Sequence, residues 1–360
     1  MRRLIRNPSH DERGAVAVIV GISMVMIVGF AAIVVDIGAL YQERRELQNG
    51  ADFAALAVAK DCATGKGNCG PYTATAQTHA NGNANDDTTA VDGVGISMAD
   101  QTAKVDTSTI ESGGGSVIAY RFARIFGQTG KTVQASATAQ WGAVSSAKAL
   151  PLTVSQCEWN KATGANVTGL PSGAVTLTFH DGMNTEPCNP GGSGSDAPGG
   201  FGWLDTSGGA CEASPNVADG SVWATSDPGA TPSRPCTPGD ISLEEDTLIP
   251  IFDAVTGSGN NASFRIIGYG AFRIEGYQLL QGNDKWSGGS GCSVPNNTTN
   301  GGGNGGGNGG GNGKGGNTET TSDGSDQSCL KGEFVDYFEA DATGNAKNPN
   351  LGATTAWLIA

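Results

Sequence analysis

The longest apolar segment of the chain lies close to its N-terminus. From Gly14 to Val35, 22 consecutive residues carry no charge. A helix rises about 1.5 Å per residue, so about 20 apolar residues cross the hydrocarbon core of a bilayer. The pattern therefore predicts a transmembrane helix. The residues that mark this anchor are Gly14, Gly21, Gly29, Phe30 and Val35.

Two other structures could produce the same run. A buried core helix would need apolar surroundings, and no other part of the chain is hydrophobic enough to provide them. A cleaved signal peptide has an apolar region of about 7–15 residues that ends in small residues before the cut. The run here is longer and continues into a helical pattern, which favours an uncleaved anchor.

The helical pattern extends beyond the lipid span, so that one anchor helix is expected over 14–60. Apolar residues recur at intervals of three and four, and only Arg44 interrupts this stripe. Small side chains in the stripe would let another helix approach closely. The stripe either packs against the chain's own domain or docks a partner helix. It consists of Ile37, Leu40, Leu47, Ala51, Ala54 and Val58.

Residues 61–150 predict a small α+β unit. Residues 117–126 have helical apolar spacing that stops at Gly127, so they predict a helix. The alternation of small or apolar with polar residues predicts strands elsewhere in the unit. These strands are expected at 94–98, 103–107 and 133–141.

Residues 151–360 predict a β-rich domain, a sandwich or a barrel, with long loops. Short strands alternate with Gly, Pro, Asn and Ser clusters. The repeated GGGN sequence at 301–317 cannot bury apolar area and predicts a flexible loop. Long irregular loops are also expected at 189–200 and 207–240. The expected strands are 174–180, 248–254, 264–280 (two strands that meet near 268–270), 332–340 and 354–360. The fold class is therefore α+β.

Composition and charge restrict the partners of the chain. Glycine makes up 57 of 360 residues and charged residues only 16%, which excludes a charge-laced helical bundle or coiled coil. The net charge is −14, and phosphate binding needs clustered Lys and Arg. A nucleic-acid partner is therefore not expected, and membrane lipid is the partner that the anchor predicts.

The charges that flank the span predict its orientation. Four arginines precede it, Arg44 and Arg45 follow it, and basic residues near a span favour the cytoplasmic side. We expect a cytoplasmic tail at 1–13, a single pass through the cytoplasmic membrane, and an extracytoplasmic C-terminal part. Without the four Arg and two acids of the tail, 17 basic and 33 acidic residues remain outside, a net charge of −16.

The eight cysteines all follow the span, in the compartment where disulfides persist. Cys62 and Cys69 bracket a short loop and suggest a local bond. A bond between Cys292 and Cys329 would close the 301–317 loop. Eight cysteines allow 105 connectivities, between which the sequence does not choose. The disulfide candidates are Cys62, Cys69, Cys157, Cys188, Cys211, Cys236, Cys292 and Cys329.

The sequence carries no motif for catalysis. It has no H-E-x-x-H, G-x-S-x-G or C-x-x-C pattern. His180 and Asp181 follow an expected strand and fit a turn better than a catalytic pair. The acidic run 244–246 is expected to be a solvated patch. We therefore predict a non-enzymatic protein, with no catalytic, cofactor-binding or metal-ligating residues and no cofactor.

The N-terminal block resembles a known family of membrane proteins. Its motifs, in order, are RGAVAV from Arg13, GFAAIVVDIG from Gly29, Tyr41, RELQ from Arg45 and ADFAALA from Ala51. They resemble the N-terminal region of the TadE/TadG-like proteins of Tad (Flp) pilus assembly, over about residues 12–60. The segment 117–141 also looks like the next part of such proteins.

The resemblance implies a minor, pilin-like component of pilus assembly or anchoring. Its partners would be other Tad pilus-system membrane proteins or pilins, contacted through the N-terminal helix. Pilin-like members are cut after a Gly, with an acid five places into the mature chain. Five residues on from Gly14 stands Ile19, and the first acid after Gly14 is Asp36, which favours the uncleaved TadG-like type. The alternative function is a membrane-tethered, adhesin-like binding module whose β-rich head recognises a ligand.

Overall fold

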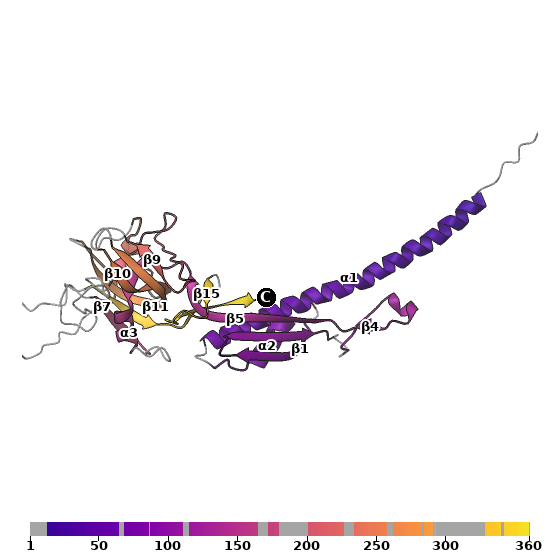
Figure 1. The fold of residues 1–360 in the computed structure, drawn as a ribbon, viewed down its shortest axis with the longest axis horizontal. Coiled ribbons are helices and arrows are strands. Elements are labelled where there is room, and N and C mark those ends of the chain that lie inside the picture. Colours follow the sequence, from indigo (N-terminus) through magenta and orange to yellow (C-terminus); the bar gives the residue numbers. More distant parts are fainter. Residues whose placement is uncertain are drawn as a thin grey trace, which may run out of the picture.

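The computed structural model of the chain is elongated, with one long helix that projects from two β-sheet regions (Figure 1). The sheet region next to the helix is called the stalk, and the distal one is called the head. The structure describes residues 13–64, 68–85, 87–110, 115–164, 172–179, 201–226, 234–257, 262–281, 284–290, 292, 328–339 and 342–359.

The projecting helix is α1 (Arg13–Thr64), 52 residues without a break. Its first part consists of apolar residues on all faces, and its second part is rich in Ala, the residue that most favours a helix. Gly50 lies inside the helix at the point where the backbone of Ala80 approaches, and a Cβ there would lie 3.2 Å from the Ala80 carbonyl oxygen. The long N-terminal helix predicted from the sequence is therefore confirmed.

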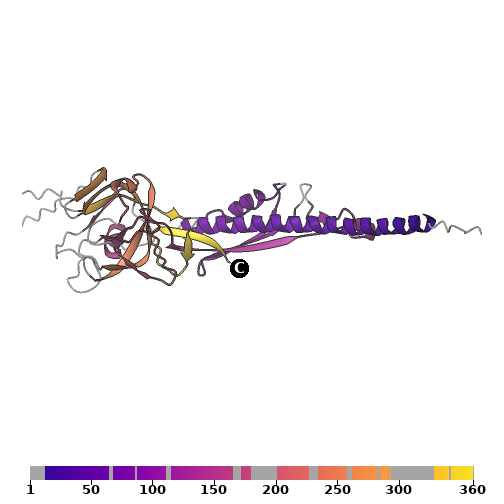
Figure 2. The ribbon, with the colours of Figure 1, turned by 90° about the horizontal axis from the view of Figure 1, so that it is seen from above.

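A six-stranded sheet forms the stalk, and the second part of α1 packs along it (Figure 2). Its path runs β1-β2-β5-β16-β14, and β15 pairs with the end of β5. The short helix α2 (Tyr72–Asn81) packs on α1. The strands are β1 (Ala90–Ser97), β2 (Thr102–Ser108), β5 (Gln134–Ser146), β14 (Tyr337–Phe338), β15 (Thr343–Asn345) and β16 (Ala353–Ile359).

This sheet confirms the three strands predicted between 94 and 141 and adds strands from the far end of the chain. β16 pairs antiparallel with β5, with Ala356 opposite Trp141. β14 runs parallel to β16. The last part of the chain thus leaves the head and completes the stalk, a long-range pairing that no local pattern indicates. The boundary predicted at residue 150 falls between β5 and the first strand of the head.

Small side chains fill the space between α1 and the stalk sheet. The buried cluster is dominated by alanine, with Val58, Val105 and Trp141 as its larger members. Alanines let the helix backbone lie close to the sheet, and each such contact adds a small amount of dispersion energy. Thr107 also donates a buried hydrogen bond to the Leu47 carbonyl oxygen at 3.1 Å, which ties β2 to α1. The helix is thus part of the core of the stalk.

The helix predicted over 117–126 is wrong. The segment forms the hairpin β3 (Ile118–Ala119) and β4 (Gly130–Lys131), with a single 3₁₀ turn, η1 (Ala123–Phe126), between the two strands. A longer helix would need a surface for its apolar side, whereas Val117, Phe122 and Ile125 are exposed here. The turn ends where Gly127 adopts a left-handed conformation, with φ of 79°.

An eight-stranded sheet forms the head, and β11 is its centre. Strand β11 pairs with four other strands, and β10 pairs with both β11 and β6. The strands are β6 (Leu152–Ser155), β7 (Val175–Phe179), β8 (Phe201–Trp203), β9 (Val222–Thr225), β10 (Asp246–Thr256), β11 (Ser263–Gln281), β12 (Asp284–Gly289) and β13 (Ser328–Phe334). The α+β class predicted from the sequence is confirmed.

Residues 264–280 form one long strand instead of the two expected strands. The glycines near 268–270 do not make a turn, because they accommodate side chains of other elements. The Trp159 indole lies directly over Gly270, and Leu351 lies over Gly268. Trp159 belongs to α3 (Gln156–Thr163), a helix that the sequence analysis did not predict. Its first turn is capped by Ser155, whose hydroxyl accepts a hydrogen bond from the Glu158 N–H at 3.2 Å.

The interval 207–240 was expected to be irregular, and its described parts, 207–226 and 234–240, contain β9 and the 3₁₀ turn η2 (Pro238–Asp240). The interval 189–200 and the glycine-rich 301–317 lie outside the described residues. His180 and Asp181 lie outside them as well.

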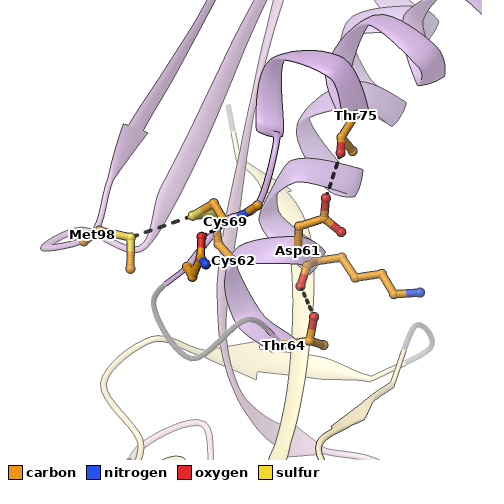
Figure 3. The surroundings of a disulfide bond; sticks show 9 residues. Asp61, Cys62, Thr64, Cys69, Thr75 and Met98 are labelled. Atoms are coloured by element: carbon orange, nitrogen blue, oxygen red, sulfur yellow. Dashed lines mark hydrogen bonds between the residues drawn. A yellow bond between two sulfur atoms is a disulfide. The ribbon is translucent and has the colours of Figure 1, made fainter.

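Three disulfides are described. Cys62–Cys69 closes the loop after α1 (Figure 3), Cys211–Cys236 lies in the head, and Cys292–Cys329 closes the segment that contains 301–317. The first and third bonds are pairings that the sequence suggested. Cys157 is also disulfide-bonded, and Cys188 lies outside the described residues. The end of α1 is further held by Thr75, which donates to the Asp61 carboxylate at 2.9 Å (Figure 3).

The contact between Gly270 and Trp159 yields a prediction about the head. The substitution Gly270→Ala places a methyl group against the buried indole, which should cost about 1–3 kcal/mol of stability. The melting temperature of the head, followed by near-UV circular dichroism, should fall by several degrees. Gly95→Ala in β1 is the matched control, because no atom lies within 4 Å of its Cβ position. Equal melting curves for the two variants would refute this account of β11.

Candidate functional site

The N-terminal part of α1 has no protein around it. Every residue from Gly14 to Val35 is exposed except Ala32, which is half-buried. The anchor residues Gly21 and Gly29 have open space where a Cβ would be. The helix is long and apolar enough to cross a membrane. An apolar surface of this size is not stable in water, so lipid or apolar protein must cover it.

The second part of α1 has the opposite environment. Of the predicted partner stripe, Leu47, Ala51, Ala54 and Val58 are buried in the stalk core. These four side chains pack within the chain. They are therefore not available to dock a partner helix, which was the other expectation for the stripe. Ile37 is exposed and Leu40 is half-buried. Only the part of the stripe nearest the span is open to a partner.

Asp36 occupies the junction between the two parts of α1. It is the first charged residue after the span, and only 6% of its surface is exposed. Its carboxylate accepts hydrogen bonds from the backbone N–H groups of Arg121 at 2.8 Å, Phe122 at 3.1 Å and Ala123 at 2.7 Å. These donors lie more than 80 residues away in the sequence. The carboxylate thus fixes the turn η1 against α1.

The surroundings of Asp36 favour its ionised form. Burial raises the pKa of the carboxyl group, but the three N–H donors and the nearby Arg121 charge lower it further than burial raises it. The pKa of Asp36 is therefore below its ordinary value, and the group carries its charge at neutral pH. A charged acceptor makes stronger hydrogen bonds than a neutral one.

The segment that Asp36 holds is named here the hairpin tip, residues 116–132. It extends beside α1 away from the head (Figure 1). Its exposed side chains include apolar, basic and a few uncharged polar ones, and the sequence contains no acidic residue between 112 and 157. Ile125 is 81% exposed and Phe122 41% exposed. The role of Asp36 was not predicted from the sequence, although a lone acid directly after an uncharged span indicates a group that needs hydrogen-bond donors.

A cleft in the head is the other candidate site. It has a volume of about 240 Å³ and lies where the head meets the stalk, between the start of β10, the 147–150 connection and Tyr337 of β14. Two of its acids are paired, Glu212 with Lys148 at 3.0 Å and Asp246 with Arg273 at 2.7 Å. Burial, followed by the charges of Glu339 and Asp246, raises the pKa of Tyr337. The acidic side chains that line the cleft are Glu212, Asp240, Glu245, Asp246 and Glu339.

The described residues contain no group of three or more His, Cys, Asp or Glu side chains that could hold a metal ion. Within the cleft, the paired carboxylates act as partners of lysine and arginine. The acidic run at 244–246 lies beside it and contributes Glu245 and Asp246 to the lining. The cleft is therefore a polar surface feature, without a recognisable catalytic arrangement among the described side chains.

Comparison with known proteins identifies the N-terminal part of the chain. Residues 14–61 match the family model Tad, described as putative Flp pilus-assembly TadE/G-like. The match covers the span, Asp36 and the part of α1 in the stalk core, so the chain carries a Tad-type N-terminal domain. No curated protein and no solved structure matches the chain significantly. The match supports a pilus-related role.

The Asp36 contact yields a prediction about the hairpin tip. Asp36→Asn removes the charge and one acceptor oxygen, so η1 should detach from α1 more often. Loss of a single charged hydrogen bond changes a local equilibrium about tenfold. Limited trypsin digestion of the purified full chain should therefore cut at Arg121 and Arg124 about tenfold faster in the variant.

Asp52→Asn provides a matched control on the same helix. The Asp52 carboxylate accepts a hydrogen bond from Gln48 within α1, at 2.9 Å, and does not touch the tip. The Asp52→Asn variant should be cut at Arg121 and Arg124 at the same rate as the unaltered chain. Equal rates for Asp36→Asn and Asp52→Asn would show that the carboxylate does not hold the tip.

Proposed function

We propose that this protein is a membrane-anchored, non-enzymatic structural component of a Tad (Flp)-type pilus system, acting in pilus assembly or anchoring. It crosses the cytoplasmic membrane once through residues 14–35. Its N-terminal tail lies in the cytoplasm, and the stalk and head stand outside. Its anchor helix contacts other pilus-system membrane proteins or pilins through residues next to the span, among them Ile37 and Leu40.

The observation that carries this proposal is the division of α1. The segment matched by the Tad model contains both a bare apolar helix and the core of a folded stalk. A cleaved leader would not contribute half of one continuous helix to a domain core. An anchor that is also a core element holds the exterior rigidly with respect to the membrane, as a structural component requires.

The disulfides support the proposed orientation. Three bonds in the described residues, all after the span, suit an oxidising compartment outside the cytoplasmic membrane. The absence of catalytic motifs from the sequence supports a non-enzymatic role.

The head cleft favours a second candidate function. An acidic cleft on a domain held away from the membrane could bind a basic group of a surface ligand. The protein would then be a tethered, adhesin-like binding module. The two functions differ in what a deletion strain loses: pili in the first case, and adhesion with normal pili in the second.

Complementation of a deletion strain tests the pilus role. The double substitution Val25→Arg with Val28→Arg places two charges in the span, and each should cost about 2.5–3.5 kcal/mol of insertion free energy. This variant should leave the membrane fraction and fail to restore pili, counted by electron microscopy. Leu358→Arg with Ile359→Arg is the control, because both residues are exposed and lie outside the span. Normal pilus numbers in the deletion strain would exclude the pilus role.

Thiol labelling tests the orientation. If the stalk and head are outside, intact membranes from growing cells should give no maleimide shift without reductant. After reduction and unfolding, all eight cysteines should be labelled. A chain trapped in the cytoplasm by deletion of residues 14–35 provides the reduced reference. Labelling of several cysteines in the anchored chain before reduction would contradict an extracytoplasmic head.

A further inference from the structure

The hairpin tip lies at the level where the anchor helix leaves the lipid. From Gly14 to Asp36 the helix rises about 33 Å, close to the thickness of a bilayer's hydrocarbon core. If residues 14–35 span this core, Asp36 stands at its outer boundary. Because Asp36 binds the backbone of residues 121–123, the tip is held at that same boundary. Ala32, one turn further into the span, is half-buried while its neighbours are exposed.

The tip exposes apolar side chains that its own fold does not cover. Val117 is 39%, Phe122 41% and Ile125 81% exposed. They come from a hairpin of two very short strands, and none of the buried apolar clusters in the described residues includes a residue of the tip. Such side chains are costly in water, and segments that combine them with Lys and Arg bind at the boundary between lipid headgroups and acyl chains.

The charge of the tip is opposite to that of the remaining exterior. The part of the chain after residue 13 has a net charge of −16, yet residues 112–157 contain no acid. Arg121, Arg124 and Lys131 are all exposed on the tip. Each basic residue near an anionic bilayer surface increases the constant for binding to the bilayer about fivefold. The combination of apolar and basic side chains matches the surface of an anionic bilayer.

The anchor helix continues this pattern just above Asp36. Tyr41, Arg44 and Arg45 are exposed there, and the Arg45 guanidinium lies 5.4 Å from the centre of the Tyr41 ring. Tyrosine and arginine are typical of the headgroup layer. Asp36 itself would be costly at this depth, but its hydrogen bonds to three N–H groups shield the carboxylate.

We infer that the hairpin tip is a second membrane contact, which lies on the outer leaflet beside the anchor helix. Phe122 and Ile125 enter the boundary between headgroups and acyl chains. Arg121, Arg124 and Lys131 bind the phosphates of anionic lipids. The helix and the tip then hold the stalk at two points, which fixes its tilt as well as its position. This inference rests on the membrane anchoring proposed above.

Depth-dependent fluorescence quenching in the full chain tests the inference. Ile125→Trp places a reporter on the tip, and Met98→Trp places one beside the Cys62–Cys69 disulfide (Figure 3), on the turn between β1 and β2, where Met98 is also exposed. Each protein is reconstituted into vesicles of brominated phosphatidylcholine mixed with anionic phosphatidylglycerol. Emission of the unaltered chain is subtracted. The bromines should quench the Ile125→Trp reporter and leave the Met98→Trp reporter unaffected.

Charge reversal tests the lipid specificity. Arg124→Glu with Lys131→Glu in the Ile125→Trp background should lower the equilibrium constant for contact at least about fivefold per residue. Lys104→Glu with Lys347→Glu is the control, because these exposed lysines lie outside the tip. In vesicles of brominated phosphatidylcholine alone, quenching should be weaker than with phosphatidylglycerol.

Flotation of the vesicles separates failure of the inference from failure of the anchoring. If the chain floats with the vesicles but the Ile125→Trp reporter is not quenched, the tip does not contact lipid and the inference is wrong. If quenching is the same in the charge-reversed variant and in neutral vesicles, the tip does not bind anionic headgroups. Quenching that disappears as protein density rises would assign the tip to a neighbouring protein. A chain that does not float refutes the anchoring and with it this inference.

Discussion

The structure depends on one constraint: a single helix has to satisfy two different environments without a break. Residues 14–35 of α1 are apolar on every face and have no protein cover, so they need lipid or another apolar surface. One face of residues 51–59 of the same helix lies in the stalk core, where alanines set the distance to the sheet. Since the helix is continuous, the environment of its first part determines the position and orientation of the stalk.

Asp36 marks the change between these environments and explains why the hairpin tip is held so far from the rest of the stalk. A carboxylate at the edge of an apolar segment needs hydrogen-bond donors, and the turn at 121–123 supplies three from the backbone. Because the donors are backbone N–H groups, the side chains of this turn do not take part in the contact with Asp36. Arg121, Phe122 and Ile125 are therefore free to face outwards. The same contact satisfies the charge on α1 and presents an apolar and basic surface beside the span.

The sequence predicted those parts of the structure that depend on local pattern. An uncharged run sufficed for the anchor helix, and alternation sufficed for the part of β5 up to Trp141. The tip was mispredicted because its apolar spacing is helical, while its conformation depends on Asp36, 85 residues away. Gly268 and Gly270 looked like a turn because a sequence does not show that Leu351 and Trp159 lie over them. The return of β16 to the stalk is a pairing between distant segments, which no local pattern encodes.

That return also determines how the head is joined to the membrane anchor. β5 leads from the stalk into the head and β16 leads back, so two neighbouring strands connect them. The head core includes Val144 and Ala353 from these strands, packed with Phe252 and Phe264. Shared packing of this kind restricts rotation more than a single linker would. From Asp36 to Thr64 the helix rises about 42 Å. With the span in a bilayer, the head is therefore held well away from the lipid, where its cleft can meet only soluble or surface-bound partners.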